Sequence, residues 1–377
     1  MEDTQYYIGL MSGTSLDGID AALVEISTSN PRPILLASHI VPLSSKLKNK
    51  LTKLSLEPSV NIIELGQTAA ELAYLYADVV AQLLQLSQLN KEQITAIGCH
   101  GITVRHAPEG EFGFSMQLID ANRLTQLCGI DVISDLRGMD IAVSGQGAPL
   151  VPAFHQALLS RYAQEIVVLN LGGIANISVI EQDQPLLGFD TGPANTLINQ
   201  WIERHTAKPY DEKGAWGQTG TLNTQLLNLL LEEPYFLKPL PKSTGKELFN
   251  LNWLDSKLDE YAQRYCGETV SIQDVQTTLT HLTAKSVAMQ IEKFNLNKVA
   301  VCGGGVENDY LMALLKSYLP NKDVFSIADM GVNPDALEAM AFAWFAYCRV
   351  NQIPGNTPSV TGATKSVVLG AWYSAGR

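Results

Sequence analysis

Cysteine is scarce in this sequence, and its spacing argues against disulfides and zinc sites. An odd number of scattered cysteines without a CxxC pair is typical of free thiols in a reducing compartment. The first residues, MEDTQYY, lack the basic and apolar regions of a secretory signal. These absences predict a cytoplasmic protein. The cysteines are Cys99, Cys128, Cys266, Cys302 and Cys348.

Long apolar runs and basic runs are missing as well. No apolar stretch reaches the ~20 residues that span a bilayer, and the longest candidate, residues 339–347, suits a buried helix. The net charge is −12, and no run of lysine and arginine is present to neutralise nucleic-acid phosphates. We therefore expect neither a membrane nor a nucleic acid as a partner. ATP remains a candidate ligand, because local backbone amides and Mg²⁺ decide whether an acidic protein binds it.

What the chain does have is enough apolar sequence for two domains. It has 377 residues, of which 46% are apolar and 17% charged, so nothing in it indicates disorder. Glycines and prolines at residues 144–152 mark a boundary. We assign residues 1–150 plus 357–377 to a first α/β domain, because the small residues of 357–364 suit a segment that returns the chain to it. Residues 151–356 form a second α/β domain.

Two stretches share one design, in which a glycine-rich turn joins two strands. Residues 6–25 read YYIGLMSGTSLDGIDAALVE, and residues 165–180 read EIVVLNLGGIANISVI. A third glycine cluster, at residues 303–305, joins a strand to a helix. Glycines let a ligand approach the backbone, and turn amides and helix N-termini bind phosphate. The first stretch alone is better explained as an ordinary hairpin, but the ordered trio predicts a nucleotide held between two related domains.

Polar residues follow two of the predicted strands. His100, Gly101 and Thr103 come after one buried strand, and Asp135 and Arg137 come after another. Ligands of open α/β sheets bind beyond the carboxyl ends of the strands, and an aspartate with an arginine suits hydroxyl or carboxylate groups. A satisfied loop histidine and a surface ion pair explain these residues equally well.

Two further carboxylates lie next to predicted helices. Asp190 lies where a strand ends and a helix begins, and Pro193 suits the first turn of that helix. Asp190 is either the cap of the helix or a general base, and the helix dipole is expected to lower its pKa. Glu338 precedes the apolar stretch of the last helix. It either points into the ligand site or is a solvated residue of the first turns.

Motifs along the whole chain carry a family resemblance. The sequence resembles the anhydro-N-acetylmuramic acid kinases, for which MSGTSLDG together with GGIAN and DTGP is highly specific. These enzymes belong to the sugar kinase, heat-shock seventy and actin superfamily, so the resemblance implies a two-domain actin-like ATPase fold with the nucleotide in the interdomain cleft. The matching segments are GLMSGTSLDGID (9–20), IGCHG (97–101), SGQGAPLVPAFH (144–155), LNLGGIANIS (169–178), FDTGPAN (189–195), KPYD (208–211), PKSTGKE (241–247), VCGGG (301–305) and PSVTGA (358–363).

The resemblance also implies a reaction. Members use ATP and Mg²⁺ to phosphorylate 1,6-anhydro-N-acetylmuramic acid while water opens the anhydro ring, which gives N-acetylmuramic acid 6-phosphate in peptidoglycan recycling. Asp190 matches the catalytic base, and Asp17 is a candidate for holding Mg²⁺ through water. Ile102 and Ala194 depart from the family pattern, which has glutamine and glycine there. The expected partners are the sugar and ATP, and a homodimer is left open.

The candidate binding residues follow from the glycine turns, the strand ends and the resemblance together. Residues expected to contact the sugar are His100, Gly101, Thr103, Asp135, Arg137 and Glu338. Residues expected to contact ATP are Gly13, Thr14, Ser15, Leu16, Asp17, Gly18, Ile19, Asp20, Gly172, Gly173, Asn176, Gly303, Gly304 and Gly305.

Two other functions are compatible with the same residues. A conventional hexose or amino-sugar kinase would use Asp190 to take a proton from a free hydroxyl, and its substrate would need no anhydro bridge. An actin-like, nucleotide-gated binding module would hydrolyse ATP slowly and contact a protein partner, without sugar-dependent release of ADP. The intact DTGP segment favours the enzyme.

Overall fold

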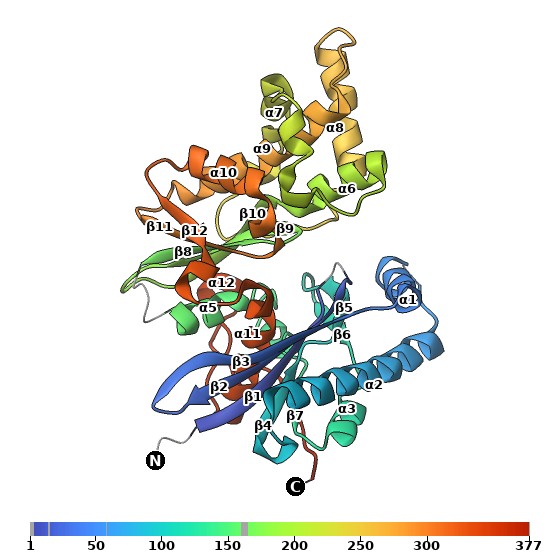
Figure 1. Ribbon diagram of the computed structural model, residues 1–377, viewed down its shortest axis with the longest axis vertical. Helices are drawn as coiled ribbons and strands as arrows, with labels where there is room; N and C mark the ends of the chain where they lie inside the picture. Colours follow the sequence, from blue (N-terminus) through green and yellow to red (C-terminus); the bar gives the residue numbers. More distant parts are fainter. Residues whose placement is uncertain (1–3, 14–15, 58, 160–164, 377) are drawn as a thin grey trace. The chain divides into compact units, whose positions relative to one another are not determined.

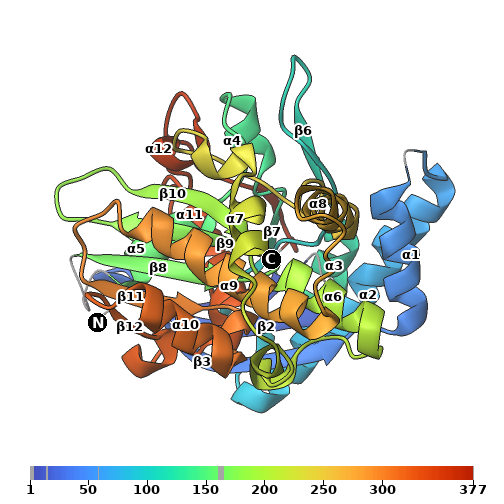
Figure 2. The same ribbon diagram turned by 90° about the horizontal axis from the view of Figure 1, so that it is seen from above.

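The computed structural model describes residues 4–13, 16–57, 59–159 and 165–376. The chain divides into two compact units, the first comprising Met1–Ser160 with Asp335–Arg377 and the second Arg161–Pro334. In each unit, helices pack on a mixed sheet (Figures 1 and 2). The prediction of two α/β domains is therefore confirmed.

The first unit is organised around a sheet in which an antiparallel meander continues into parallel strands. The strand order is β13-β7-β4-β1-β2-β3. Strands β1, β2 and β3 pair antiparallel, whereas β4 pairs parallel to β1 and β7 parallel to β4. A separate hairpin is formed by β5 (Ile102–Ala107) and β6 (Phe114–Leu118). The strands of the main sheet are β1 (Thr4–Met11), β2 (Gly18–Ser27), β3 (Asn30–Pro42), β4 (Ile94–Cys99), β7 (Val132–Ser134) and β13 (Ala371–Tyr373).

Helices pack on both faces of this sheet. The long helix α2 (Ile62–Ser87) begins at Asn61, whose side-chain oxygen accepts hydrogen bonds from the amides of Ile63 and Glu64. Its apolar stripe packs against alternate residues of β1 and β2, including Ile8. The other helices of the unit are α1 (Ser45–Leu56), α3 (Ala121–Cys128), α4 (Gly138–Ala142), α5 (Val151–Leu159), α11 (Leu337–Val350) and α12 (Pro358–Thr361).

The second unit repeats the strand pattern of the first. Its sheet has the order β10-β9-β8-β11-β12, with β8, β9 and β10 antiparallel and β11 and β12 parallel to β8. This is the order β3-β2-β1-β4-β7 with the same strand directions, so the two predicted hairpins occupy equivalent places. The strands are β8 (Ile166–Leu171), β9 (Ile174–Ile180), β10 (Leu187–Pro193), β11 (Lys298–Cys302) and β12 (Asp323–Ser326). The helices are α6 (Asn195–Thr206), α7 (Thr224–Leu231), α8 (Leu251–Arg264), α9 (Ile272–Ile291) and α10 (Asp309–Tyr318).

Helix α11 packs with the first unit, although the sequence places residues 151–356 in the second domain. The units divide between residues 160 and 161 and between residues 334 and 335. Strands β1 and β4 approach α11 through glycines. An ideal Cβ on Gly9 would overlap the carbonyl oxygen of Ala339, and one on Gly98 would overlap that of Phe342. The helix therefore lies directly on the two strands, on the face opposite to α2, and residues 335–356 belong to the first unit by packing.

This close approach can be tested with two alanine substitutions. Gly98→Ala should lower the free energy of unfolding by ~1–3 kcal/mol, because the added methyl group overpacks a contact between two backbones. Gly66→Ala is the matched control, since Gly66 lies in the second turn of α2 and a Cβ there meets nothing within 4 Å. The control should raise stability by ~0.5–1 kcal/mol. Urea unfolding that gave the two variants the same stability would contradict the packing described.

Candidate active site

In the first unit, His100 and Arg137 meet beyond the ends of two neighbouring parallel strands. His100 follows β4 and Arg137 follows β7. The His100 Nε2 atom lies 3.1 Å from Arg137 Nε and 3.0 Å from Arg137 Nη2. Because a guanidinium only donates, Nε2 accepts and Nδ1 carries the proton, which it donates to the Gly101 carbonyl at 2.9 Å. Burial, followed by the charge of Arg137, lowers the pKa of His100 to about 3, so the ring is neutral.

Two carboxylates accompany this pair. Glu338 lies in the first turn of α11, and Phe342, one turn later, has its ring 4.7 Å from that of His100. Burial raises the pKa of Glu338, the charge of Asp20 raises it further, and Arg137 opposes both. Burial also raises the pKa of Asp20 to about 6, with smaller contributions from Asp335 and Asp17. His100, Arg137, Glu338 and Asp20 thus form one electrostatically coupled group in the first unit.

Asp135 and Thr103, also predicted to bind the sugar, have other surroundings. Asp135 is exposed and has a positive φ of 53°. Its carboxylate lies next to Gly138, the first residue of α4. Asp135 lines an open polar hollow of about 830 Å³ together with residues from 108–115 and 141–146. Thr103 accepts a hydrogen bond from Gln117 Nε2 at 3.1 Å. Within the described parts of the chain, neither Asp135 nor Thr103 is hydrogen-bonded to His100 or Arg137, so the structure does not join them to that group.

The first glycine turn is only partly described, because Thr14 and Ser15 lie outside the described residues. Leu16 has a positive φ of 57° and donates its amide to the Gly13 carbonyl at 3.0 Å. The side chains of Leu16 and Ile19 are buried in the apolar core, so only their backbone is available to a ligand. Asp17 is exposed and pairs with Lys48 at 2.9 Å. A Cβ on Gly18 would lie 2.8 Å from the Val41 carbonyl oxygen, so packing on β3 already requires that glycine.

In the second unit, the turn at Gly172 and Gly173 holds the start of α6. The Gly172 carbonyl accepts a hydrogen bond from the amide of Asn195, and the Gly173 carbonyl accepts from the amides of Ala194 and Thr196. The first amides of α6 therefore donate to the carbonyls of the turn and are not available to a phosphate. A Cβ on Gly173 would lie 2.7 Å from Thr196 Oγ1.

The third glycine cluster lies beside this turn. Strands β8 and β11 are parallel neighbours with Cys302 in register with Asn170, so both turns leave the same edge of the sheet. Gly303 has a positive φ of 80°, and a Cβ on Gly303 or Gly305 would clash with the end of β8. A Cβ on Gly304 would meet nothing within 4 Å. Packing within the described residues therefore does not require a glycine at position 304.

Asp190 lies in strand β10 and is not a helix cap. Helix α6 begins five residues later, at Asn195, and its cap is Ala194. Strand pairing puts Asp190 opposite Asn176, which is itself opposite Asn170, so the three side chains form one row across the sheet. The helix-cap alternative is wrong, because the Asp190 carboxylate accepts a hydrogen bond from the Thr244 amide at 2.9 Å and from no amide of α6.

The surroundings of Asp190 raise its pKa instead of lowering it. Burial has the largest effect and brings the pKa to about 7; the Thr244 amide opposes it, and the charge of Glu247 adds to it. The expected lowering by a helix dipole is wrong for the same reason as the cap, since the residue lies in a strand. Its backbone is fixed as well, with its amide donating to the Lys242 carbonyl at 3.0 Å and its carbonyl accepting from the Tyr235 hydroxyl at 2.7 Å.

Several residues that support the site escape prediction from the sequence. Lys242 is buried and donates to the carbonyls of Tyr235 and Phe236, which holds the segment that contacts Asp190. Asp140 is fully buried in the first unit and organises the segment after α4. Lys242 lies within the segment PKSTGKE and Asp140 lies just before SGQGA, but neither segment by itself reveals the partners, and those of Asp140 at Asn356 and Thr361 are more than 200 positions away.

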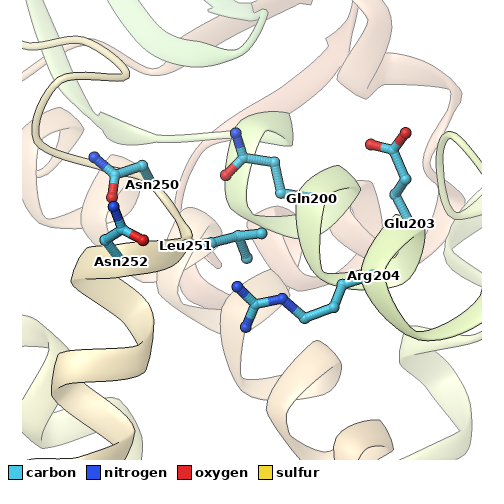
Figure 3. A pocket seen from close by; sticks show the side chains of 6 residues that line it. All are labelled: Gln200, Glu203, Arg204, Asn250, Leu251 and Asn252. Carbon is cyan, nitrogen blue, oxygen red and sulfur yellow. The ribbon is translucent and has the colours of Figure 1, made fainter.

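One open hollow of the second unit contains none of the predicted residues. It has a volume of about 550 Å³, and its side chains come from α6 and the start of α8 (Figure 3). Arg204, on its wall, forms two hydrogen bonds with Asp255, and Asn250 caps α8. These bonds engage Arg204 and Asn250, whereas the buried Oε1 atom of Gln200 has no hydrogen-bond partner among the described residues. The lining residues are Gln200, Glu203, Arg204, Asn250, Leu251 and Asn252.

Two general features complete the description. Within the described parts of the chain, no group of three or more histidine, cysteine, aspartate or glutamate side chains is arranged to hold a metal ion. No helix in those same parts has the length and apolarity needed to cross a bilayer.

Comparison with known proteins identifies the family. Residues 5–375 match the family model for anhydro-N-acetylmuramic acid kinase. The chain belongs to this family. It is 47% identical to the anhydro-N-acetylmuramic acid kinase of Pasteurella multocida over 375 residues, which is 99% of this chain and 97% of the relative. It is 46% identical to that of Haemophilus influenzae, covering 98% of each chain. Family membership makes the chain a sugar kinase and confirms the predicted enzyme class.

Solved structures show more distant likeness. The activator of the 2-hydroxyisocaproyl-CoA dehydratase from Clostridium difficile with bound ADPNP has a TM-score of 0.45 at 10% identity, covering 92% of this chain and 96% of that one. A ROK family glucokinase from Streptomyces griseus in complex with glucose and AMPPNP has a TM-score of 0.41 at 14% identity, covering 90% and 99%.

The raised pKa of Asp190 predicts how stability depends on pH. In the folded protein this pKa is about 7, well above the ~3.9 of an unfolded aspartate. The folded state therefore binds the proton more tightly, and the stability gained from it is complete below pH ~4 and lost as the pH rises through about 7. Asp190→Asn, which does not titrate, should gain melting temperature over the wild type at pH 8 and less at pH 5.

Asp259→Asn serves as the control for this measurement, because Asp259 is exposed on α8. Its difference from the wild type should be the same at both pH values. A difference for Asp190→Asn that did not grow between pH 5 and pH 8 would show that burial does not raise this pKa.

The open space beside Gly304 predicts a variant that folds but binds nucleotide poorly. Gly304→Ala adds a methyl group that meets no protein atom within 4 Å, so its unfolding should match that of the wild type. If phosphates approach this turn closely, the same methyl group should weaken ATP binding about tenfold or more. Isothermal titration with ATP measures this, and wild-type affinity in the folded variant would remove residue 304 from the nucleotide site.

Proposed function

We propose that this kinase phosphorylates 1,6-anhydro-N-acetylmuramic acid at oxygen 6 with Asp190 as the base that activates water for ring opening. The observation that carries the proposal is the state of Asp190, a half-buried carboxylate of strand β10 whose pKa is raised by desolvation to about 7. A base whose pKa lies near the working pH is both deprotonated in part and strong enough to accept a proton. Its Oδ2 atom accepts a hydrogen bond from the Thr244 amide, whereas Oδ1 has no hydrogen-bond donor among the described residues, which suits proton transfer.

The chemistry of the substrate explains why a base is needed. Oxygen 6 of the anhydro sugar is bonded to carbon 1 and carries no proton, so it is a poor nucleophile until that bond breaks. Water gives a proton to Asp190 and its oxygen bonds to carbon 1 as the bond from carbon 1 to oxygen 6 opens. Oxygen 6 then attacks the γ-phosphorus of ATP in line, and ADP leaves. The contribution of the chain is to position the groups and to neutralise charge.

The glycine turns supply the expected contacts to ATP. The turns 172–173 and 303–305 leave the same edge of the second sheet, next to the row that contains Asn176 and Asp190. We infer that their backbone amides, with those of the first hairpin, hold the phosphates. The topology shared by the two sheets supports this assignment, because it gives each unit an equivalent hairpin.

Mg²⁺ fits the first unit better at Asp20 than at Asp17. Asp17 already pairs with Lys48 at 2.9 Å, whereas Asp20 has no ion pair among the described residues and feels the negative charges of Asp335 and Asp17. An oxygen ligand in such surroundings suits a hard cation that arrives with the nucleotide and keeps its waters. When bound, the ion would offset charge on the phosphates.

The cellular setting is proposed from the same features. The five cysteines, all within the described residues, are free thiols, which supports a reducing cytoplasm as the compartment. The role in peptidoglycan recycling follows from membership of the family. A homodimer also stays a proposal, and light scattering of the purified protein would decide it.

Asp190→Asn tests the mechanism directly. The change keeps the size of the side chain and an acceptor for Thr244 but removes the basic oxygen. We expect ATP and sugar to bind nearly as in the wild type, while turnover falls by at least the roughly 10²–10⁴-fold attributed to a general base. Asp259→Asn is again the control and should turn over normally. Near-wild-type turnover of Asp190→Asn would refute the proposed base.

Isotope labelling separates this reaction from its rivals. In ¹⁸O-labelled water, the label should appear at carbon 1 of the product and not in its phosphate. Label in inorganic phosphate with no sugar product would indicate simple ATP hydrolysis, as in a nucleotide-gated binding module. Phosphorylation of a free hydroxyl without label in the sugar would indicate a conventional kinase.

A further inference from the structure

Arg137 is a partly buried cation held on one side by neutral groups. Its Nε and Nη2 atoms donate to His100 Nε2, at 3.1 and 3.0 Å, and its Nη1 atom donates to the Gly147 carbonyl at 2.7 Å. A guanidinium has two hydrogens on each terminal nitrogen. One N–H on Nη1 and one on Nη2 therefore remain without an acceptor among the described residues.

The charge of Arg137 also lacks a direct counter-ion in the described chain. No carboxylate there lies within ion-pair distance of it, although Glu338 and Asp140 act on it from farther away. Both oxygens of Asp140 are already engaged, one by the Gly147 amide and the other by Asn356 and Thr361. A partly desolvated guanidinium with a free pair of N–H groups is the arrangement that binds a planar oxyanion in two places.

The position of Arg137 is set by groups that do not touch a ligand. Asp140 is fully buried and accepts hydrogen bonds from the Gly147 amide at 2.8 Å, from Asn356 Nδ2 at 2.7 Å and from Thr361 Oγ1 at 2.8 Å. Gly147 has a positive φ of 67°, and a Cβ there would lie 2.9 Å from Ile141, so the carbonyl that receives Nη1 has one orientation.

The neutral ring of His100 fixes the other side of the guanidinium. The ring is held by the Gly101 carbonyl at 2.9 Å, and the aromatic ring of Phe342 lies 4.7 Å away. Since both supports are uncharged acceptors, they orient the cation without neutralising it. The free edge of Arg137 is thus fixed in direction and keeps its charge for a ligand.

We propose that Arg137 binds the carboxylate of the lactyl ether of the sugar and thereby selects anhydro-muramic acid over the anhydro-glucosamine sugar that lacks this group. The inference rests on the proposed function and deepens it. At neutral pH the lactyl carboxylate is the one charged group of this substrate, and its two oxygens match the two free N–H groups. A phosphate carries more negative charge and suits the surroundings less well, because Asp20 and Glu338 act on the same group.

The test compares two sugars on two proteins. Release of ADP is measured with 1,6-anhydro-N-acetylmuramic acid and with 1,6-anhydro-N-acetylglucosamine, for the wild type and for Arg137→Gln. The wild type should prefer the muramic sugar. In Arg137→Gln, kcat/KM for the muramic sugar should fall roughly 10- to 100-fold, the loss of a charge-assisted pair, whereas kcat/KM for the glucosamine sugar should change little. The preference should therefore collapse.

Controls separate selection from general damage. Arg123→Gln removes an exposed arginine of α3 that pairs with Asp120, and it should leave both values unchanged. Asp140→Asn disturbs the support of Gly147 and should raise KM for the muramic sugar more than it lowers kcat. If Arg137→Gln does not fold, Arg137→Lys decides by the same ratio, because it keeps the charge but loses the paired N–H groups and should show a smaller drop in the preference.

Each other outcome counts against the proposal. An equal loss on both sugars would mean that Arg137 contacts a phosphate or a part common to both sugars. No loss on either, or no preference in the wild type, would overturn it outright. A wild type that releases ADP with neither sugar would refute the proposed function itself. If the wild type is active and Arg137→Gln keeps its preference for the muramic sugar, only the role of Arg137 is refuted.

Discussion

The first unit depends on the backbone contact between α11 and strands β1 and β4. Gly9 and Gly98 leave no room for a side chain between strand and helix, so the helix lies at one distance and in one orientation. The positions of the residues on the first turns of α11 are therefore fixed relative to the sheet. Glu338 is presented toward the charged group, and Phe342 lies against His100, whose ring in turn holds Arg137. A methyl group between the sheet and α11 would therefore displace the site together with the core.

In the second unit, the register of the paired strands fixes the positions of the candidate residues. The turn at Gly172 and Gly173 accepts the first amides of α6, which ties the helix to the hairpin. Parallel pairing of β8 with β11 brings the turn 303–305 to the same edge, and antiparallel pairing puts Asn176 beside Asp190. Because side chains alternate along a strand, a slip of one residue would turn Asp190 into the core. The bonds from its backbone to Tyr235 and Lys242 oppose such a slip.

Burial gives the candidate residues of each unit their chemical character. Taking a carboxylate out of water favours its neutral form, which brings the pKa of Asp190 to about 7 and that of Asp20 to about 6. The same desolvation keeps His100 neutral, so that it accepts from Arg137 instead of repelling it. The raised pKa of Asp190 and the neutral state of His100 thus have one physical origin, the exclusion of water from both side chains.

The elements, the repeated strand–turn–strand design and the family could all be predicted from the amino-acid sequence. Alternating apolar residues, the cap at Asn61 and glycines at turns are local signals, and local signals are sufficient where backbone conformation and one apolar face decide the outcome. Only the tertiary structure decided that Asp190 belongs to a strand, since the bonds that hold it come from residues 45 or more positions away. It also decided which sheet takes α11, because that helix is apolar on nearly all sides and has no polar face to orient it. The supports at Asp140 and Lys242 and the raised pKa of Asp190 likewise arise from contacts distant in the chain and from exclusion of water, and a linear pattern encodes neither.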